Sequence, residues 1–116
     1  MKICVTGGRD YDNYATVTAV LDKFHQCTPI TLLIEGGAAG ADRLCRLWAI
    51  NNNVPFTTVN AEWQRHGRQA GPIRNERMLA WYNPDILIAF PGGKGTRHCI
   101  DAATRRGIKV MEVSDV

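Results

Sequence analysis

Five short apolar runs rich in β-branched residues alternate with segments of helical periodicity, and this alternation restricts the possible folds more than any other feature. The runs are KICVT, ITLLIE, PFTTVN, DILIAF and KVMEV, at 2–6, 30–35, 55–60, 85–90 and 109–113. Strands that alternate with helices form βαβ units, which build a parallel sheet with helices on both faces. The sequence therefore predicts an α/β, three-layer fold with about five mostly parallel strands.

Helical spacing follows four of these runs. Apolar side chains recur on one face at 14–26, 40–52, 73–82 and 96–106, and the last segment ends at Gly107, a typical helix stop. Residues 60–72 carry no such pattern; they are polar and contain two glycines and a proline. An irregular loop of this length in a small domain is more often functional than a plain connector. We therefore expect 60–72 to form a lid.

Length and charge restrict the function. The chain has 116 residues, which fits a single domain over 1–116, and a formal net charge of +3. That charge suits an anionic small ligand but is too weak for a duplex-binding surface, so a nucleic-acid partner is not expected. The start MKICVTGG is no signal peptide, and no apolar run approaches the ~18 residues of a membrane span. We expect a cytoplasmic protein without a membrane partner.

The four cysteines are Cys4, Cys27, Cys45 and Cys99, and none forms a C-x-x-C pair. They fall on segments with regular periodicity, so we interpret them as reduced thiols in the core. The histidines show no metal-ligand spacing. No motif requires a metal or another cofactor.

Three glycine-rich corners follow predicted strands: TGGRD at 6–10, EGGAAGAD at 35–42 and PGGKGT at 91–96. In a parallel sheet all strand-to-helix turns lie on one edge, where ligands bind. Glycine lets a ligand approach the backbone, and free N–H groups at the following helix start attract phosphate. None of the corners is a Walker A motif or a G-x-G-x-x-G motif. The three corners together predict a phosphate-binding edge, although tight structural turns also use glycine.

These corners, together with GGRDY and EWQRHGRQAGPIRNERM, resemble the YspA-like branch of the SLOG superfamily, in family order and over nearly the whole chain. The resemblance implies a Rossmann-like fold related to the LOG phosphoribohydrolases and the DprA domain. It also implies binding of a nucleotide or a nucleotide-derived ligand, such as an ADP-ribose-like or NAD-like molecule. Genomic context links members of this branch to nucleotide signalling and phage conflict.

The resemblance marks site residues in four segments. They are Gly7, Gly8 and Arg9; Gly36, Gly37, Gly40 and Asp42; Arg74, Asn75 and Glu76; and Gly92, Gly93, Gly95 and Thr96. Ala38 and Pro91 lie within the same motifs. LOG enzymes place acidic residues after PGGxGT, one of them catalytic, whereas this chain has Arg97, His98 and Cys99. The catalytic carboxylate would then have to come from elsewhere, with Glu76 the first candidate and Glu35 or Asp42 behind it.

Several of these side chains have a structural interpretation beside the functional one. Arg74 could grip a phosphate or lie on the surface, and Asn75 could read a base or ribose hydroxyl or cap a helix. Asp42 could contact a ribose hydroxyl, orient the glycine loop, or interact with the helix dipole.

Three further residues outside the glycines are candidates for ligand contact. Trp63 could stack on a base, with Arg65, His66 and Arg68 as an anion clamp, or anchor its loop. His98 could face the ligand and move protons, or be a polar helix residue. Asp10 could hold a sugar hydroxyl or start a helix.

Three functions follow from these residues. The first is binding of a nucleotide-derived signal, with sequestration or sensing as its role. The second is an enzyme, a nucleotide N-glycosidase of LOG type, and the third a nucleic-acid-binding module like DprA. By analogy with LOG proteins we also expect a homodimer or higher homo-oligomer, formed through Trp48, Leu79 and Trp81.

Overall fold

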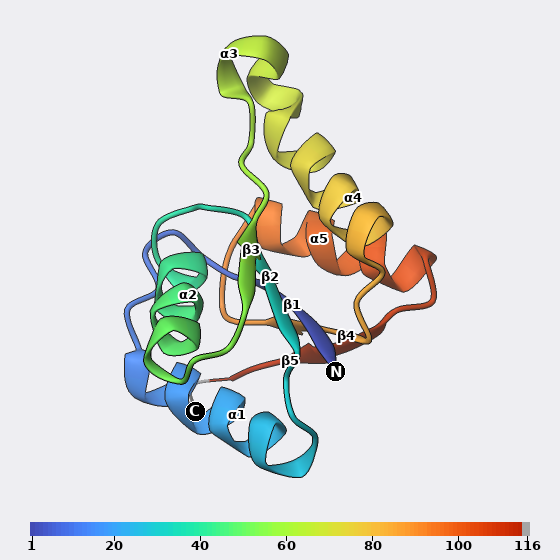
Figure 1. Cartoon of the computed structure of the whole chain (residues 1–116). Coiled ribbons are helices and arrows are strands. Elements are labelled where there is room, and N and C mark those ends of the chain that lie inside the picture. The colour runs from blue at the N-terminus through green and yellow to red at the C-terminus, as the bar shows by residue number, and fades with distance from the viewer. Residues whose placement is uncertain (115–116) are drawn as a thin grey trace.

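The computed structural model describes residues 1–114 and contains one five-stranded sheet, with every neighbouring pair parallel and the order β3-β2-β1-β4-β5 (Figure 1). The strands are β1 (Lys2–Thr6), β2 (Leu32–Glu35), β3 (Phe56–Thr58), β4 (Ile86–Ala89) and β5 (Lys109–Glu112). Four of the predicted runs are longer than the observed strands. At Ile30 and Phe90 the buried apolar run continues past the end of the strand. The predicted α/β, Rossmann-like three-layer architecture is confirmed.

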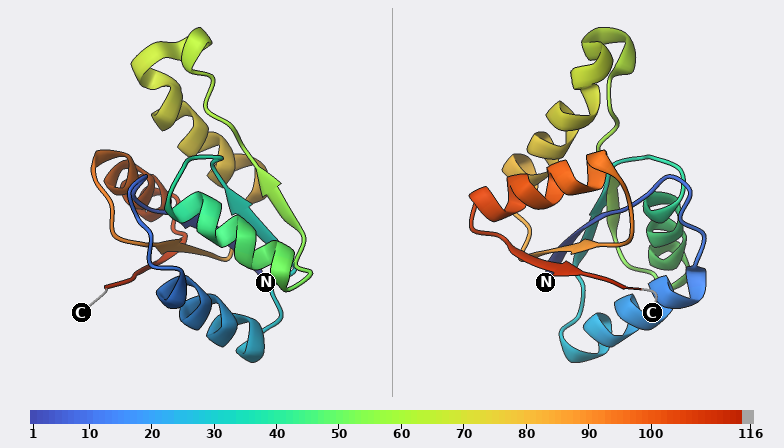
Figure 2. Two further views of the ribbon diagram at one scale, coloured as in Figure 1. Left: turned by 90° about the vertical axis from the view of Figure 1, so that its left-hand side faces the viewer. Right: turned by 180° about the vertical axis from the view of Figure 1, so that it is seen from behind.

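Four long helices cover the two faces of the sheet (Figure 2). Helices α1 (Tyr14–Cys27) and α2 (Ala41–Asn51) pack on one face, and α4 (Ala70–Tyr82) and α5 (Lys94–Arg105) pack on the other. Side chains alternate along β1, so Ile3 and Val5 join the core under α1 and α2, whereas Cys4 joins the core under α4 and α5.

Residues 60–72, which we call the arm, project beyond the carboxyl edge of the sheet (Figures 1 and 2). The prediction of an irregular loop here is wrong: the arm holds α3 (Trp63–His66) and the 3-10 turn η1 (Gly67–Gln69), and α4 already begins at Ala70. Pro72 therefore lies in the first turn of α4, where a missing N–H costs no helical hydrogen bond. No residue of α3 or η1 is buried, so apolar periodicity could not reveal them.

Burial corrects two predictions, one about the cysteines and one about the residues of the expected dimer contact. All four cysteines are free, but Cys27 is exposed at the end of α1 while the other three are buried. Burial raises the pKa of the Cys99 thiol to about 12. Trp48 and Leu79, expected at a dimer contact, are 0% and 1% exposed, and Trp48 donates its indole N–H to Asp22 at 2.8 Å. Among the three proposed contact residues only Trp81 reaches the surface, at 63% exposure.

None of the helices within residues 1–114 has the length and apolar character needed to cross a membrane.

Candidate functional site

The sheet order places a crevice between β1 and β4. From β1 the chain adds β2 and then β3 on one side, and it later adds β4 and β5 on the other side. Such a reversal leaves the loops after the two central strands diverging, and ligands of doubly wound folds bind there. A cavity of about 570 Å³ lies at this point, between the loops after β1 and β4 and the N-terminal part of α4.

Residues from four segments line this cavity, which we call the main cavity. They are Thr6, Gly7, Gly8, Arg9, Asp42, Trp63, Arg68, Gly71, Pro72, Arg74, Asn75, Met78, Gly93, Lys94, Gly95, Thr96 and His98. The structure therefore brings together most of the residues predicted in the first and last corners. Five of the lining residues were not predicted from the sequence: Thr6, Gly71, Pro72, Met78 and Lys94. Lys94 sits inside the PGGKGT corner, so its position already indicated a role.

The first and last corners lock against each other. Gly8 donates its N–H to the carbonyl of Pro91 at 2.9 Å, and a Cβ on Gly8 would lie 2.9 Å from that same oxygen. Gly92 lies close to the same contact, because a Cβ on it would be 2.7 Å from the Gly8 nitrogen. Pro91 and Gly92 thus hold the first corner in place and do not line the main cavity. Gly93 to Thr96 lie beyond this contact and do line it.

The second corner is closed by its own carboxylates. Asp42 accepts the N–H groups of Gly36 at 3.1 Å and Ala38 at 3.2 Å through one oxygen, Oδ2. Glu35, which is fully buried, accepts the N–H of Gly37 at 2.7 Å. These amides are no longer free to bind an anion. Of the five residues predicted in this corner, only Asp42 lines the main cavity, and Gly36, Gly37, Ala38 and Gly40 do not.

The buried carboxylate of Asp42 has an altered acidity. Burial raises its pKa from 3.8 to about 6, with a further upward contribution from the Glu35 charge. The N–H of Ala38, the Arg74 charge and the N–H of Gly36 each act in the opposite direction. Asp42 thus carries out one predicted role, orientation of the glycine loop, and it also faces the main cavity.

A hydrogen-bonded chain crosses the cavity wall from the second corner to α5. Arg74 donates Nη1 to the carbonyl of Gly36 at 2.6 Å and Nε to Oδ1 of Asn75 at 2.9 Å. Asn75 is 2% exposed, and its Nδ2 lies 3.2 Å from the carbonyl of Gly95 and 3.3 Å from Nδ1 of His98. Because Oδ1 accepts from Arg74, Nδ2 is the donating end of this amide. Asn75 is neither a helix cap nor a surface residue; it joins α4 to the last corner.

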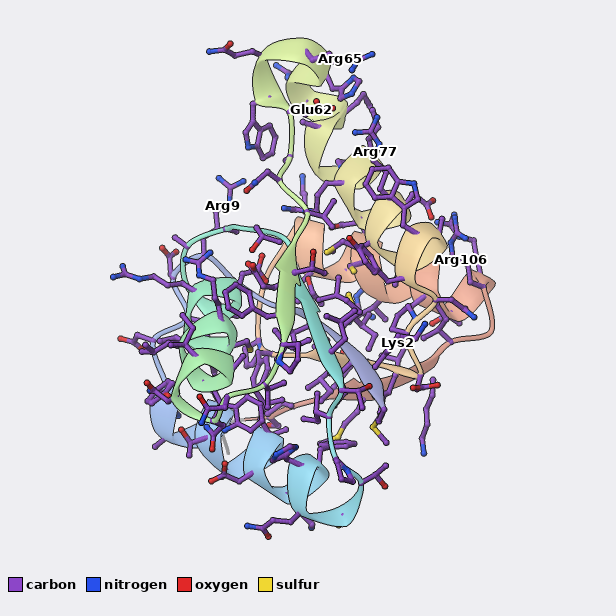
Figure 3. All side chains as sticks on the ribbon, in the orientation of Figure 1. Lys2, Arg9, Glu62, Arg65, Arg77 and Arg106 are labelled. Carbon is purple, nitrogen blue, oxygen red and sulfur yellow. The ribbon has the colours of Figure 1, made fainter. Side chains whose placement is uncertain are left out.

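The arm brings an aromatic ring to the mouth of the main cavity. Arg9 points from the first corner toward the arm (Figure 3), and its guanidinium lies 5.2 Å from the ring centroid of Trp63. Trp63 is 48% exposed, so a large part of the ring is free of protein contacts. Arg68, from the turn after α3, lines the same cavity. Of the predicted clamp residues, Arg65 and His66 do not line it.

Two predicted residues lie elsewhere. Glu76 pairs with Arg105 and Arg106, each at 3.3 Å, and does not line the main cavity. It follows Asn75 in a helix, and one residue turns a side chain by about 100°, so Glu76 points away from the face that carries Asn75. This placement does not support Glu76 as the catalytic carboxylate. Asp10 is exposed and also lies outside the cavity lining.

The charge of the main cavity is positive. Its lining holds the cations Arg9, Arg68, Arg74 and Lys94 and one carboxylate, Asp42. No side chain within residues 1–114 caps the N-terminus of α5, which borders the cavity. Helix α4 continues directly from η1, and the N–H of Ala70 already donates to the carbonyl of Gly67. Free N–H groups and these cations favour a bound anion. In the same described part of the chain, no group of three His, Cys, Asp or Glu side chains could hold a metal ion.

Two comparisons with known proteins agree on the relationship. The family model described as the YspA, cpYpsA-related SLOG family matches residues 1–66, more than half of the chain. The Gene 61 protein of Mycobacterium phage D29 is 34% identical over 122 aligned residues, which cover 98% of this chain and 97% of that protein. The chain therefore belongs to the YspA, cpYpsA-related SLOG family.

Proposed function

We propose that this protein binds a nucleotide or nucleotide-derived signalling ligand, an ADP-ribose-like or NAD-like molecule or a nucleoside phosphate, in the main cavity. One observation carries the proposal. Four cationic side chains and the uncapped N-terminus of α5 meet at one cavity that holds a single carboxylate. A phosphate satisfies both the charge and the free N–H groups. Membership of a SLOG family supports a nucleotide-related function.

The three parts of a nucleotide have chemically suitable partners here. Lys94 and the first turn of α5 suit the phosphates. Arg9 adds a further positive charge on the side of the cavity next to the arm. The exposed face of Trp63 suits a base, because aromatic rings stack on nucleobases without strong sequence preference. Asp42, in the cavity wall, can accept a hydrogen bond from a ribose hydroxyl through its Oδ1 atom.

The proposed role is sequestration or sensing of the ligand, in conflict between a phage and its host. A phage protein 34% identical to this chain supports that setting. Binding without turnover distinguishes this role from catalysis. No cofactor enters the proposal.

The test is a retention assay with purified protein in excess over a panel of nucleoside monophosphates, ADP, NAD, ADP-ribose and cyclic ADP-ribose. After ultrafiltration, the retained ligand is released by heat and identified. We expect at least one member to leave the filtrate and return intact. Lys94→Gln should weaken that retention about tenfold, since a charge-assisted hydrogen bond is lost.

Lys23→Gln is the matched control, because Lys23 is an exposed lysine on α1, outside the main cavity, and the substitution changes the net charge equally. It should leave retention unchanged. Equal weakening by both variants would indicate nonspecific attraction to a basic protein. If every compound stays in the filtrate, the proposed function is wrong for this panel.

A second candidate function is an N-glycosidase, and Asp42 favours it. This residue supplies the carboxylate of the main cavity, and its raised pKa of about 6 is a feature of acid–base residues. Release of free base and ribose phosphate by the wild-type protein, lost in Asp42→Asn, would establish the activity. Intact recovery of every retained ligand would exclude it for the same panel.

A further inference from the structure

A second cavity, of about 350 Å³, adjoins the main cavity. It follows one face of α4 and reaches α5, with Pro72, Ile73, Glu76, Arg77, Ala80, Trp81, His98 and Arg106 as its lining. Pro72 and His98 line both cavities. In Figure 3, Arg77 and Arg106 lie on the side of α4 away from Arg9. The two cavities therefore meet at Pro72 and His98 and extend from there in different directions.

The cations of the two cavities differ in their pairing. In the second cavity Arg77 pairs with Glu62 at 2.8 Å, and Arg106 pairs with Glu76 at 3.3 Å. In the main cavity Arg9, Arg68 and Lys94 have no carboxylate partner within residues 1–114. A paired cation has already lost much of its attraction for an anion. The main cavity thus suits the phosphates, and the second cavity suits an uncharged group.

Each cavity is lined by a tryptophan whose ring lies against an arginine guanidinium. The guanidinium of Arg77 lies 5.6 Å from the ring centroid of Trp81, as that of Arg9 lies 5.2 Å from Trp63. Trp81 is 63% exposed, which is unusual for the largest apolar side chain. Along α4, Pro72 and Trp81 are nine residues apart, which at 1.5 Å per residue is about 14 Å. One aromatic ring cannot occupy both cavities, but a ligand with two rings can.

We propose that the second cavity is a subsite for the second nucleoside of a dinucleotide, with the linking phosphates in the main cavity and one base on Trp81. This inference rests on the proposed function and narrows its ligand class to two nucleosides joined through phosphates. Trp81 stacks on the distal base and Arg77 supports the ring from its other side. The distal nucleoside carries no charge, which matches the paired cations of this cavity.

Calorimetry with ADP, NAD and diadenosine diphosphate tests the subsite. In the wild-type protein both dinucleotides should bind at least about tenfold more tightly than ADP, the gain expected for one stacked base. Trp81→Ala should remove that gain and leave the ADP affinity unchanged, while Trp81→Phe should keep most of it. Ile50→Ala, which truncates an exposed apolar side chain on α2, should change neither affinity.

The outcomes separate the two proposals. Equal affinity for ADP and the dinucleotides, with the Lys94→Gln effect intact, overturns the subsite and leaves the proposed function standing. No binding of any compound overturns both. Light scattering adds one further result: a dimer that dissociates in Trp81→Ala, with all three affinities unaffected by the substitution, would show that Trp81 meets a second copy of the chain and would overturn the subsite.

Discussion

The corners at 35–42 and 91–96 have similar composition and position, yet they behave in opposite ways. In EGGAAGAD the amides of Gly36, Gly37 and Ala38 donate to carboxylates of the corner itself. In PGGKGT, Gly93 to Thr96 line the main cavity, and within residues 1–114 no side chain caps the helix that starts there. Three internal N–H bonds close one corner, and their absence leaves the other open to a ligand.

The difference lies in the acids, not in the glycines. Glu35 and Asp42 flank the closed corner, whereas Pro91 and His98 stand at the corresponding positions of the open corner. A carboxylate at a helix start satisfies the N–H groups that would otherwise hold a phosphate. Glycine-rich turns on one edge of a sheet therefore do not all contact the ligand, and some glycines serve only to let the corners pack on each other.

The largest expected effect comes from Gly40→Ala. Gly40 has φ of +73°, and a Cβ there would collide with the carbonyl oxygen of Gly8. The strained backbone and the collision should together reduce the free energy of unfolding by about 3 kcal/mol or more. Urea denaturation measures the change.

Gly95→Ala is the counterpart in the open corner. Gly95 lies within α5, and a Cβ added there would meet no atom within 4 Å, so alanine should be neutral or stabilise by about 0.5–1 kcal/mol. Equal destabilisation by the two substitutions would show that both corners are packed tightly. It would contradict the difference between a closed corner at 35–42 and an open corner at 91–96.

Asp42→Asn should flatten the pH dependence of stability. The unfolded chain releases the Asp42 proton near pH 3.8, while the folded protein holds it to about pH 6. Ionisation therefore favours the unfolded state, and this contribution to stability is present below pH 3.8 and lost as pH rises through 6. Two pKa units correspond to about 3 kcal/mol as an upper limit.

The quantity to measure is the difference in unfolding free energy between wild type and Asp42→Asn at several pH values from about 3.5 to 7, a range that spans both pKa values. Asparagine can still accept both N–H groups through its carbonyl oxygen, so the corner should stay closed. We expect the wild type to lose stability relative to the variant across this range. A constant difference would mean that Asp42 titrates normally in the folded protein.

Amide hydrogen exchange compares the two corners directly. The amides of Gly36 and Ala38, bonded to Asp42, should exchange at least about tenfold more slowly than those of Lys94 and Gly95, because a bonded amide must open before it exchanges. Addition of ADP should then slow exchange at 94–96 and leave 36–38 unchanged. Protection of 36–38 on ligand addition would mean that the closed corner also binds.

Much of the fold was predictable from the sequence, because buried parallel strands are continuous apolar runs and the helices keep one apolar face. The arm was not, since no residue of α3 or η1 is buried. Within the site, the last corner does form a wall of the cavity, with Gly93, Gly95 and Thr96 in place. The closure of the second corner depends on where Asp42 points, which spacing alone does not reveal. The turn of about 100° between Asn75 and Glu76 could have shown that they do not face the same ligand, but both were predicted in the site.

The smallest effect concerns the ring of His98. The amide of Asn75 accepts from Arg74 through Oδ1, so its Nδ2 end faces Nδ1 of His98 at 3.3 Å. A donor at that distance requires an acceptor, so neutral His98 should carry its proton on Nε2. Long-range nitrogen–carbon correlation spectra distinguish the two tautomers of the neutral ring.

We expect the Nε2–H form in the wild-type protein and a mixture of forms in Asn75→Ala, because alanine removes the donor that faces Nδ1. His25 is an internal reference: its Nδ1 accepts the N–H of Ile30 at 3.0 Å, and this contact is independent of Asn75. The tautomer of His25 should therefore be the same in both proteins. A wild-type His98 with its proton on Nδ1 would mean that the hydrogen bond between Asn75 and His98 does not form. The open corner would then be held by contacts other than Asn75.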